Sequence, residues 1–136
     1  MAACTLLIVD DDAVIRGTLR ELATLCVDGV VVVGEAANGR EAVALARRLN
    51  PDVIVMDIRM PVMDGIQATR KIKRELGLSS VVITATSFGH REIERAALAA
   101  GASYHLRKPF DIDAFVSVLQ EAQAVAAGAI GSSARA

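Results

Sequence analysis

The sequence is poor in aromatic residues and cysteine, and it has no excess of positive charge. Aromatic side chains make up 3% of the 136 residues and tryptophan is absent, so the core has to be built from Val, Ile, Leu and Ala. The formal net charge of −1 arises from 15 basic and 16 acidic residues. Because nucleic-acid binders need a clustered basic excess, we expect a protein partner or a small ligand and no direct binding of nucleic acid by this chain.

The cysteines and the apolar runs bear on where the protein works. Cys4 and Cys26 are too few for a disulfide framework, and their apolar neighbours predict buried, reduced thiols. The apolar stretch at residues 6–9 runs directly into three aspartates and does not resemble a signal peptide. No apolar run approaches the roughly 20 residues that a membrane-spanning helix requires. We therefore expect a cytoplasmic protein with no membrane contact.

Short apolar runs alternate with longer amphipathic segments along the chain. Runs of Val and Ile without polar alternation are typical of strands buried on both faces of a parallel sheet. The alternation predicts an α/β fold: a doubly wound, five-stranded parallel sheet of flavodoxin-like strand order 2-1-3-4-5, with helices on both faces. The expected strands are residues 6–9, 30–33, 53–56, 81–85 and 104–107. The expected helices are residues 13–25, a segment ending at Leu49, a segment between Asp64 and Gly77, residues 91–100 and residues from 112 onward.

A few residues mark the expected ends and core positions of these elements. Asp12 can cap the first helix, where Val14, Leu22 and Leu25 are expected among the apolar positions. Gly34 is expected to close the second strand.

Polar residues follow the predicted strands at their carboxyl ends, where ligands bind in such sheets. Asp10 and Asp11 follow the first strand, Asp57 ends the third, Thr86 follows the fourth and Lys108 follows the fifth. Three converging carboxylates repel one another, and a hard divalent cation such as Mg²⁺ resolves that repulsion. Each residue also has an ordinary interpretation: helix capping for the aspartates, a surface position for the lysine, and strand propensity for the threonine. Capping is the interpretation we adopt for Asp12.

The same residues resemble the signature of a known family. Val9-Asp10-Asp11, the D-x-x-M-P-x-M-D-G run at residues 57–65, Thr86 and the Lys-Pro-Phe at residues 108–110 resemble response regulator receiver domains of two-component signalling. The resemblance predicts a receiver domain at residues 5–122, followed by an Ala/Gly/Ser-rich tail at residues 123–136 whose end, from Gly128, we expect to be frayed.

The resemblance implies a role for each matching position at the metal and phosphoryl site. Asp57 would accept a phosphoryl group from a phosphohistidine of a sensor histidine kinase or a phosphotransfer protein. Asp11 would bind Mg²⁺ directly, Asp10 would hold it through water, and Asp57 and the backbone carbonyl of Arg59 would complete the protein ligands. Lys108 would pair with the bound phosphoryl group.

The resemblance also implies how the phosphoryl group would be read out. Thr86 would swing its hydroxyl toward the phosphoryl oxygen; Thr84 and Ser87 lie nearby, but the interval to Lys108 selects Thr86. The family's aromatic switch position falls on His105 in this chain, and we interpret that residue as an exposed strand position.

The resemblance also implies how fast the phosphoryl group is lost and which partners the domain has. Arg59 and Phe88 are bulky at the positions that modulate dephosphorylation, which predicts slow loss of the phosphoryl group. We expect magnesium-dependent self-phosphorylation of Asp57 and no other enzymatic activity. A downstream protein partner is expected, a homodimer is compatible with the family, and the chain would be a single-domain receiver or one cut before an output domain.

Three other functions fit the sequence less well. A receiver-like interaction module that is never phosphorylated usually lacks one of the acids, the lysine or the hydroxyl, and all are present here. A haloacid-dehalogenase-like phosphatase needs a second acid two residues after the nucleophile, where this chain has Arg59. A nucleotide-binding domain needs a glycine-rich loop after the first strand, and none is present.

Overall fold

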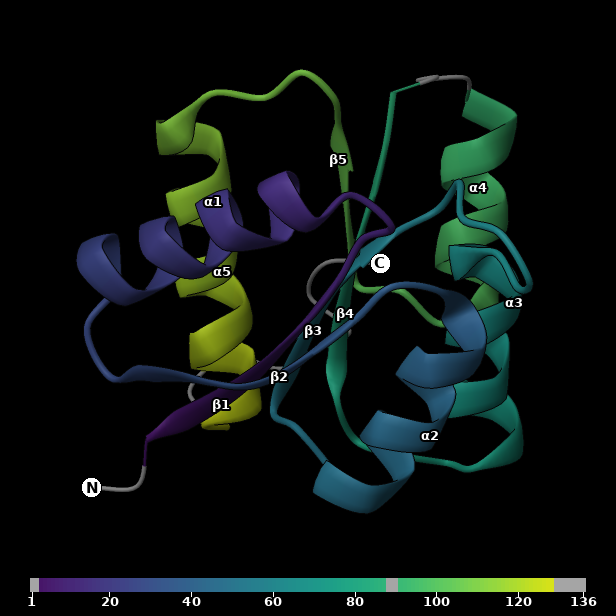
Figure 1. Cartoon of the computed structure of the whole chain (residues 1–136). Coiled ribbons are helices and arrows are strands. Elements are labelled where there is room, and N and C mark those ends of the chain that lie inside the picture. The colour runs from purple at the N-terminus through teal and green to yellow at the C-terminus, as the bar shows by residue number, and fades with distance from the viewer. Residues whose placement is uncertain (1–2, 88–90, 129–136) are drawn as a thin grey trace.

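Five parallel strands form one sheet in the order β2-β1-β3-β4-β5, as a computed structural model shows for residues 3–87 and 91–128 (Figure 1). This order confirms the flavodoxin-like topology predicted from the sequence. The strands are β1 (Cys4–Val9), β2 (Val30–Ala36), β3 (Val53–Asp57), β4 (Val81–Thr86) and β5 (Tyr104–Arg107). The helices are α1 (Ala13–Cys26), α2 (Gly39–Leu49), α3 (Gly65–Arg70), the π-helical turn η1 (Lys71–Glu75), α4 (Arg91–Ala100) and α5 (Ile112–Ala126).

Helices cover both faces of the sheet. In Figure 1, α1 and α5 lie on one side of the strands, and α2, α3 and α4 lie on the other. Each layer has its own apolar cluster: Leu19 of α1 and Phe115 of α5 pack in one, while Ala46 of α2 and Ile72 of η1 pack in the other. Every residue of β3 and β4 is buried, which explains why these strands are mostly apolar, with Asp57, Thr84 and Thr86 as the exceptions.

Side-chain caps start the helices that lead away from the functional end of the sheet. The carboxylate of Asp12 accepts hydrogen bonds from the backbone nitrogens of Val14 and Ile15, which confirms its predicted role at the start of α1. Asp64 forms a capping box with Gln67 at the start of α3.

The buried face of α1 differs from the prediction. Val14 and Leu25 are 77% and 82% exposed, so they do not belong to the core. Leu19 and Ala23, one turn apart, are buried instead, and at about 100° per residue the two exposed side chains lie roughly 120–140° away from Leu19 around the helix. Cys26, expected to be buried, is exposed although it lies at nearly the same angle around the helix as Leu19, and it is the last residue of α1. Cys4 is half-buried.

The second strand is longer than predicted. Gly34 does not close it: β2 continues to Ala36 through an irregularity at which Leu6 pairs with Val32 but Leu7 pairs with Gly34. A bulge of this kind inserts one extra residue, and glycine is common in one because it has no side chain to pack. The continuation brings Glu35 beside the end of β1.

The ends of two other segments also bear on the predictions. The helix after Asp64 changes to a π-helical turn at Lys71, before Gly77. Residues 123–126, assigned above to the tail, form the last turn of α5, and residues 129–136, where fraying was expected, lie outside the described residues. None of the helices in residues 3–87 and 91–128 has the length and apolar character needed to cross a membrane.

The start of α3 packs directly against the end of β3. A Cβ added to Gly65 would overlap the backbone oxygen of Asp57 and lie 2.8 Å from the Cα of Ile58. The backbone nitrogen of Gly65 also donates to the carbonyl of Ile58 at 2.8 Å. Glycine at this position therefore sets how closely the helix approaches the strand that ends in Asp57.

We predict that Gly65→Ala destabilises the protein by more than about 2 kcal/mol, because backbone atoms of β3 would have to move. Gly17→Ala is the matched control: it lies inside α1 with nothing within 4 Å of the added Cβ, so it should stabilise by about 0.5–1 kcal/mol. Urea unfolding measures both. Equal midpoints for the two variants would contradict the close packing of α3 on β3.

Candidate functional site

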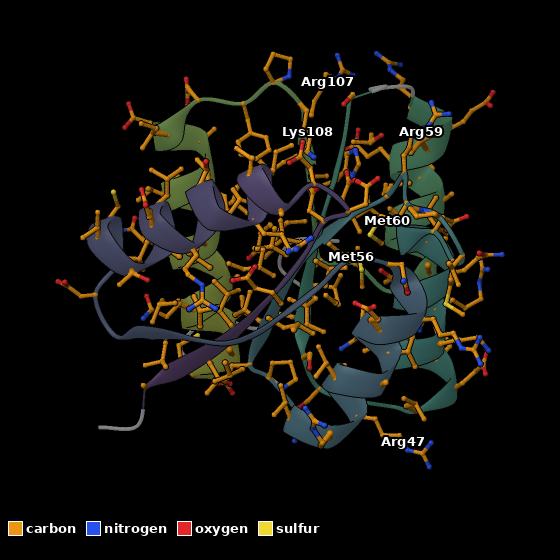
Figure 2. All side chains as sticks on the ribbon, viewed as in Figure 1. Arg47, Met56, Arg59, Met60, Arg107 and Lys108 are labelled. Atoms are coloured by element: carbon orange, nitrogen blue, oxygen red, sulfur yellow. The ribbon has the colours of Figure 1, made fainter. Side chains whose placement is uncertain are left out.

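The predicted site residues meet at the carboxyl end of the sheet, at the point where the strand order reverses. Asp10 follows β1, Asp57 ends β3 and Lys108 follows β5. Figure 2 shows Lys108 and Arg59 at the same end of the sheet, and Arg47 at the opposite end. An open cavity at this end is lined by Asp10, Asp11, Asp12, Ala13, Ile15, Asp57, Arg59, Ser87 and Lys108.

Three carboxylates converge in this cavity. One carboxylate oxygen from each of Asp10, Asp11 and Asp57 lies within 4.8 Å of the others. Asp10 and Asp57 are 2% and 8% exposed, whereas Asp11 faces solvent. The neighbouring Asp12 is used as the cap of α1. The cluster is therefore open to solvent through Asp11, while its other two members are screened from water.

Lys108 joins two of the carboxylates. Its Nζ donates to Oδ2 of Asp10 at 2.9 Å and to Oδ1 of Asp57 at 3.2 Å. Burial works against the charged ammonium, but the hydrogen bonds and charges of the two aspartates outweigh it, so the pKa of Lys108 lies above its usual value. The lysine thus stays protonated and balances part of the negative charge.

The charge on Asp57 is only partly balanced. The pKa of the Asp57 carboxyl is raised to about 6: burial raises it most, Lys108 opposes this, and Asp10 and Asp11 add to the rise. Ionised Asp57 at neutral pH therefore costs the folded state free energy in the absence of further positive charge. A cation or the neutralisation of one carboxylate would relieve that cost.

Arg59 and Thr86, two of the predicted site residues, differ in their exposure. Arg59 is exposed and its side chain lines the opening. Thr86 is fully buried, and its carbonyl accepts a hydrogen bond from the backbone nitrogen of Lys108 at 2.8 Å. The neighbouring Ser87 lines the cavity, whereas the interval to Lys108 had favoured Thr86.

His105 is not the exposed strand residue that we expected. It is half-buried, and its Nδ1 lies 2.8 Å from the hydroxyl oxygen of Thr84, an interior strand residue as predicted. Its Nε2 is buried without a hydrogen-bond partner among the described residues. Burial lowers the pKa of His105, with Glu94 opposing and Arg107 adding to the effect, so the imidazole is neutral at pH 7. The correction arises because α4 packs against β5.

The loop that carries the acidic pair is held at several atoms. The backbone nitrogen of Asp10 donates to the carbonyl of Ala36 at 3.1 Å, and its Oδ1 accepts from the backbone nitrogen of Asp12 at 2.9 Å. The carbonyl of Asp10 accepts from Nη1 of Arg16 at 2.7 Å. The sequence interpretation did not identify Arg16 as a residue of this site. The one available signal was its position four residues after Asp12, one turn into the helix.

The fold and the site together define a doubly wound α/β domain with an acidic, lysine-bridged pocket at its switch point. The family model described as the response regulator receiver domain matches residues 6–120, and the chain belongs to that family. It is therefore a signal-receiving domain of the two-component type.

Curated relatives include whole proteins of similar size and longer ones. The chain is 39% identical over 117 residues to the chemotaxis protein CheY of Halobacterium salinarum, covering 83% of this chain and 94% of that protein. It is 40% identical over 114 residues to the transcriptional regulatory protein PdtaR of Mycobacterium tuberculosis, covering 84% of this chain. The chain spans only 54% of the length of PdtaR.

Solved structures agree with the fold. The signal receiver domain of the response regulator NarL from Mycobacterium tuberculosis superposes with a TM-score of 0.84 at 28% identity, covering 90% of this chain and 98% of that one. A CheX–CheY–BeF3–Mg²⁺ complex from Borrelia burgdorferi matches with a TM-score of 0.78 at 29% identity, over 93% of this chain and 90% of the solved one.

We predict that Asp57→Asn stabilises the metal-free protein at pH 7.5. The folded pKa of about 6 lies above the ordinary value of 3.8. The stability that protonated Asp57 contributes is therefore fully present below about pH 4 and is lost as the pH rises through 6. Removing the charge should raise the free energy of unfolding at pH 7.5 by on the order of 1–3 kcal/mol, and by much less at pH 4.

Urea unfolding in EDTA at the two pH values measures this difference. Asp28→Asn, at an exposed position outside the cavity, is the control. It should change the free energy of unfolding by the same small amount at both pH values. A variant no more stable than the parent at pH 7.5 would show that the site tolerates the ionised carboxylate without cost.

Proposed function

We propose that this receiver domain accepts a phosphoryl group on Asp57 from a phosphohistidine of a sensor histidine kinase or phosphotransfer protein. The observation that carries the proposal is the position of Asp57 at the end of β3, in the open cavity beside Lys108 and two further carboxylates. Such a site can bring a nucleophilic oxygen and positive charge to one phosphorus atom, which is the main requirement of phosphoryl transfer.

The transfer itself is a single displacement. A carboxylate oxygen of Asp57 attacks phosphorus, the bond from phosphorus to the imidazole nitrogen of the donor breaks, and its electron pair leaves with the imidazole. Lys108 already lies 3.2 Å from Oδ1 of Asp57 and can turn to the incoming phosphoryl oxygens. The product is an aspartyl phosphate on this chain.

The donor set fits Mg²⁺. Asp10, Asp11 and Asp57 present hard carboxylate oxygens within 4.8 Å of one another, and the raised pKa of Asp57 indicates a need for positive charge. Asp11 and Asp57 would bind the ion directly, Asp10 would hold it through water, and the carbonyl of Arg59 would complete the set. When bound, Mg²⁺ would neutralise oxygens of the phosphoryl group. The solved CheX–CheY–BeF3–Mg²⁺ complex from Borrelia burgdorferi holds the same ion.

The aspartyl phosphate would act by shifting the balance between two conformations. Thr86, at the end of β4, and His105, half-buried on β5, are the residues proposed to respond. A downstream protein partner would read the change, and the protein would work in the cytoplasm as a monomer or homodimer. Arg59 at the cavity opening supports slow release of phosphate; Phe88, the second residue in that prediction, lies outside the described residues.

We predict that acetyl phosphate with Mg²⁺ adds one phosphoryl group to the protein and that Asp57→Asn abolishes the addition. Omitting Mg²⁺ should reduce the addition at least about tenfold, because the carboxylates would repel the donor. Intact mass measures the product. Asp28→Asn, which leaves the cavity untouched, should be phosphorylated like the parent. A folded parent that gains no mass would instead favour a receiver that signals without phosphorylation.

Lys108→Gln should separate binding of the metal from transfer. Removing the ammonium that contacts Asp10 and Asp57 should tighten Mg²⁺ binding roughly three- to fivefold, since a competing charge is lost. Phosphorylation should nevertheless slow by at least about tenfold, because a charged donor to the phosphoryl oxygens is removed.

Calorimetric titration and a time course of intact mass measure the two effects. Lys71→Gln is the matched control: this lysine is paired with Glu75 on η1 and does not line the cavity. Parent-like phosphorylation of the Lys108 variant would exclude a direct role of the lysine in the transfer.

A further inference from the structure

We infer that Arg16 is a positioning residue that fixes the peptide unit between Asp10 and Asp11 and so aims both carboxylates into the cavity. The inference rests on the proposed function, because it concerns the residues assigned there to Mg²⁺ and the phosphoryl group. Arg16 itself does not line the cavity.

The guanidinium of Arg16 has two partners on different elements. Its Nε donates to Oε1 of Glu35 on β2 at 3.0 Å, and its Nη1 donates to the carbonyl oxygen of Asp10 at 2.7 Å. The side chain is only 18% exposed. A planar guanidinium with two donors in fixed relative positions can hold both acceptors in one geometry, which a flexible lysine ammonium cannot.

The contact to Asp10 matters because a carbonyl oxygen and the next nitrogen belong to one rigid plane. Holding the carbonyl of Asp10 therefore sets the direction in which the chain enters Asp11. Asp11 is exposed, so the direction of its carboxylate depends chiefly on the backbone that carries it. Fixing this plane decides where the two carboxylates point relative to Asp57.

Glu35 makes the arginine compatible with an acidic metal site. An unpaired cation beside Asp10 would compete with a metal for the carboxylates. The hydrogen bonds and charges of Arg20 and Arg16 outweigh the effect of burial and keep the pKa of Glu35 below its usual value, so it remains ionised and pairs with Arg16. Arg16 can thus supply hydrogen bonds at the site with little net charge.

The irregularity in β2 places Glu35 for this purpose. After Gly34 the register brings Glu35 opposite Ile8 and Ala36 opposite Val9. The carbonyl of Ala36 then accepts from the nitrogen of Asp10. The end of β2 therefore holds the acidic loop twice: directly at the backbone, and through Glu35 and Arg16.

Arg20 provides a matched comparison within the same cluster. Its Nε donates to Oε2 of Glu35 at 2.7 Å, and its side chain is 46% exposed. It shares the carboxylate partner of Arg16, but no hydrogen bond from it to the acidic loop is found in the described part of the chain. Loss of Arg20 removes one ion pair with Glu35 and leaves the Asp10 carbonyl held.

The first arm of the test measures Mg²⁺ affinity by calorimetric titration of the full chain. Arg16→Gln should weaken binding roughly tenfold, as expected when a residue that orients metal ligands is lost, while Arg20→Gln should stay within about twofold of the parent. Circular dichroism confirms that each variant is folded at the working temperature. If Arg16→Gln fails to fold, Arg16→Lys and Arg20→Lys replace the pair, with an expected loss of roughly threefold for the first alone.

The second arm uses metal-free protein and so does not depend on the proposed function. Hydrogen exchange by NMR should become roughly tenfold faster at the amides of Asp10 and Asp12 in the Arg16 variant and stay unchanged in the Arg20 variant. Amides in the middle of β3 serve as the internal reference for global stability.

The two arms separate failure of this inference from failure of the proposed function. Equal changes in affinity and exchange for the Arg16 and Arg20 variants would overturn the positioning role, whatever the parent does with acetyl phosphate. A parent that binds no Mg²⁺ and gains no phosphoryl group would overturn the proposed function and, with it, the inferred purpose of Arg16. Localised faster exchange would then show only a structural contact.

Discussion

The structure depends on the concentration of negative charge at the buried carboxyl end of a parallel sheet. Asp10 and Asp57 lie 98 and 51 residues from Lys108 in the sequence, yet its ammonium contacts both. Parallel strands bring such distant residues together because all their carboxyl ends meet at one edge. The pKa of Asp57 is raised chiefly by its burial and further by Asp10 and Asp11, and Lys108 offsets only part of this. A site with unbalanced negative charge is ready to bind a cation and, with it, an anionic phosphoryl group.

Close packing around the strand ends keeps this charge in place. Gly65 lets α3 approach the backbone of Asp57 more closely than any residue with a Cβ would allow. On the other side, β2 continues past Gly34 so that Ala36 and Glu35 hold the loop after β1. Glycine is needed for the close approach of backbone at position 65, whereas at Gly34 the nearest atoms belong to the side chains of Leu7 and Leu49. The frame around the acidic cavity is therefore built from backbone contacts as well as side chains.

Much of the fold could be predicted because its signals are local. Buried strands such as β3 and β4 are mostly apolar runs, and the caps Asp12 and Asp64 form hydrogen bonds with nitrogens no more than three residues away. The acidic residues were found because they directly follow such runs. Errors occurred where a local pattern had two outcomes: Gly34 can end a strand or lie in a bulge, and Val14 can face the core or solvent. Only the docking of α1 on the sheet and the register of β2 against β1 decide between them.

The sequence by itself determined the order of strands and helices, the acids and the lysine at the strand ends, and through them the family. These features depend on residue type and on spacing along the chain, which the sequence states directly. The tertiary structure alone decided that Arg16 reaches both Glu35 and the carbonyl of Asp10, that Ser87 lines the cavity while Thr86 is buried, and that His105 contacts Thr84. These are contacts between neighbouring strands or between a helix and a loop. Their geometry follows from register and packing, which no short stretch of sequence specifies.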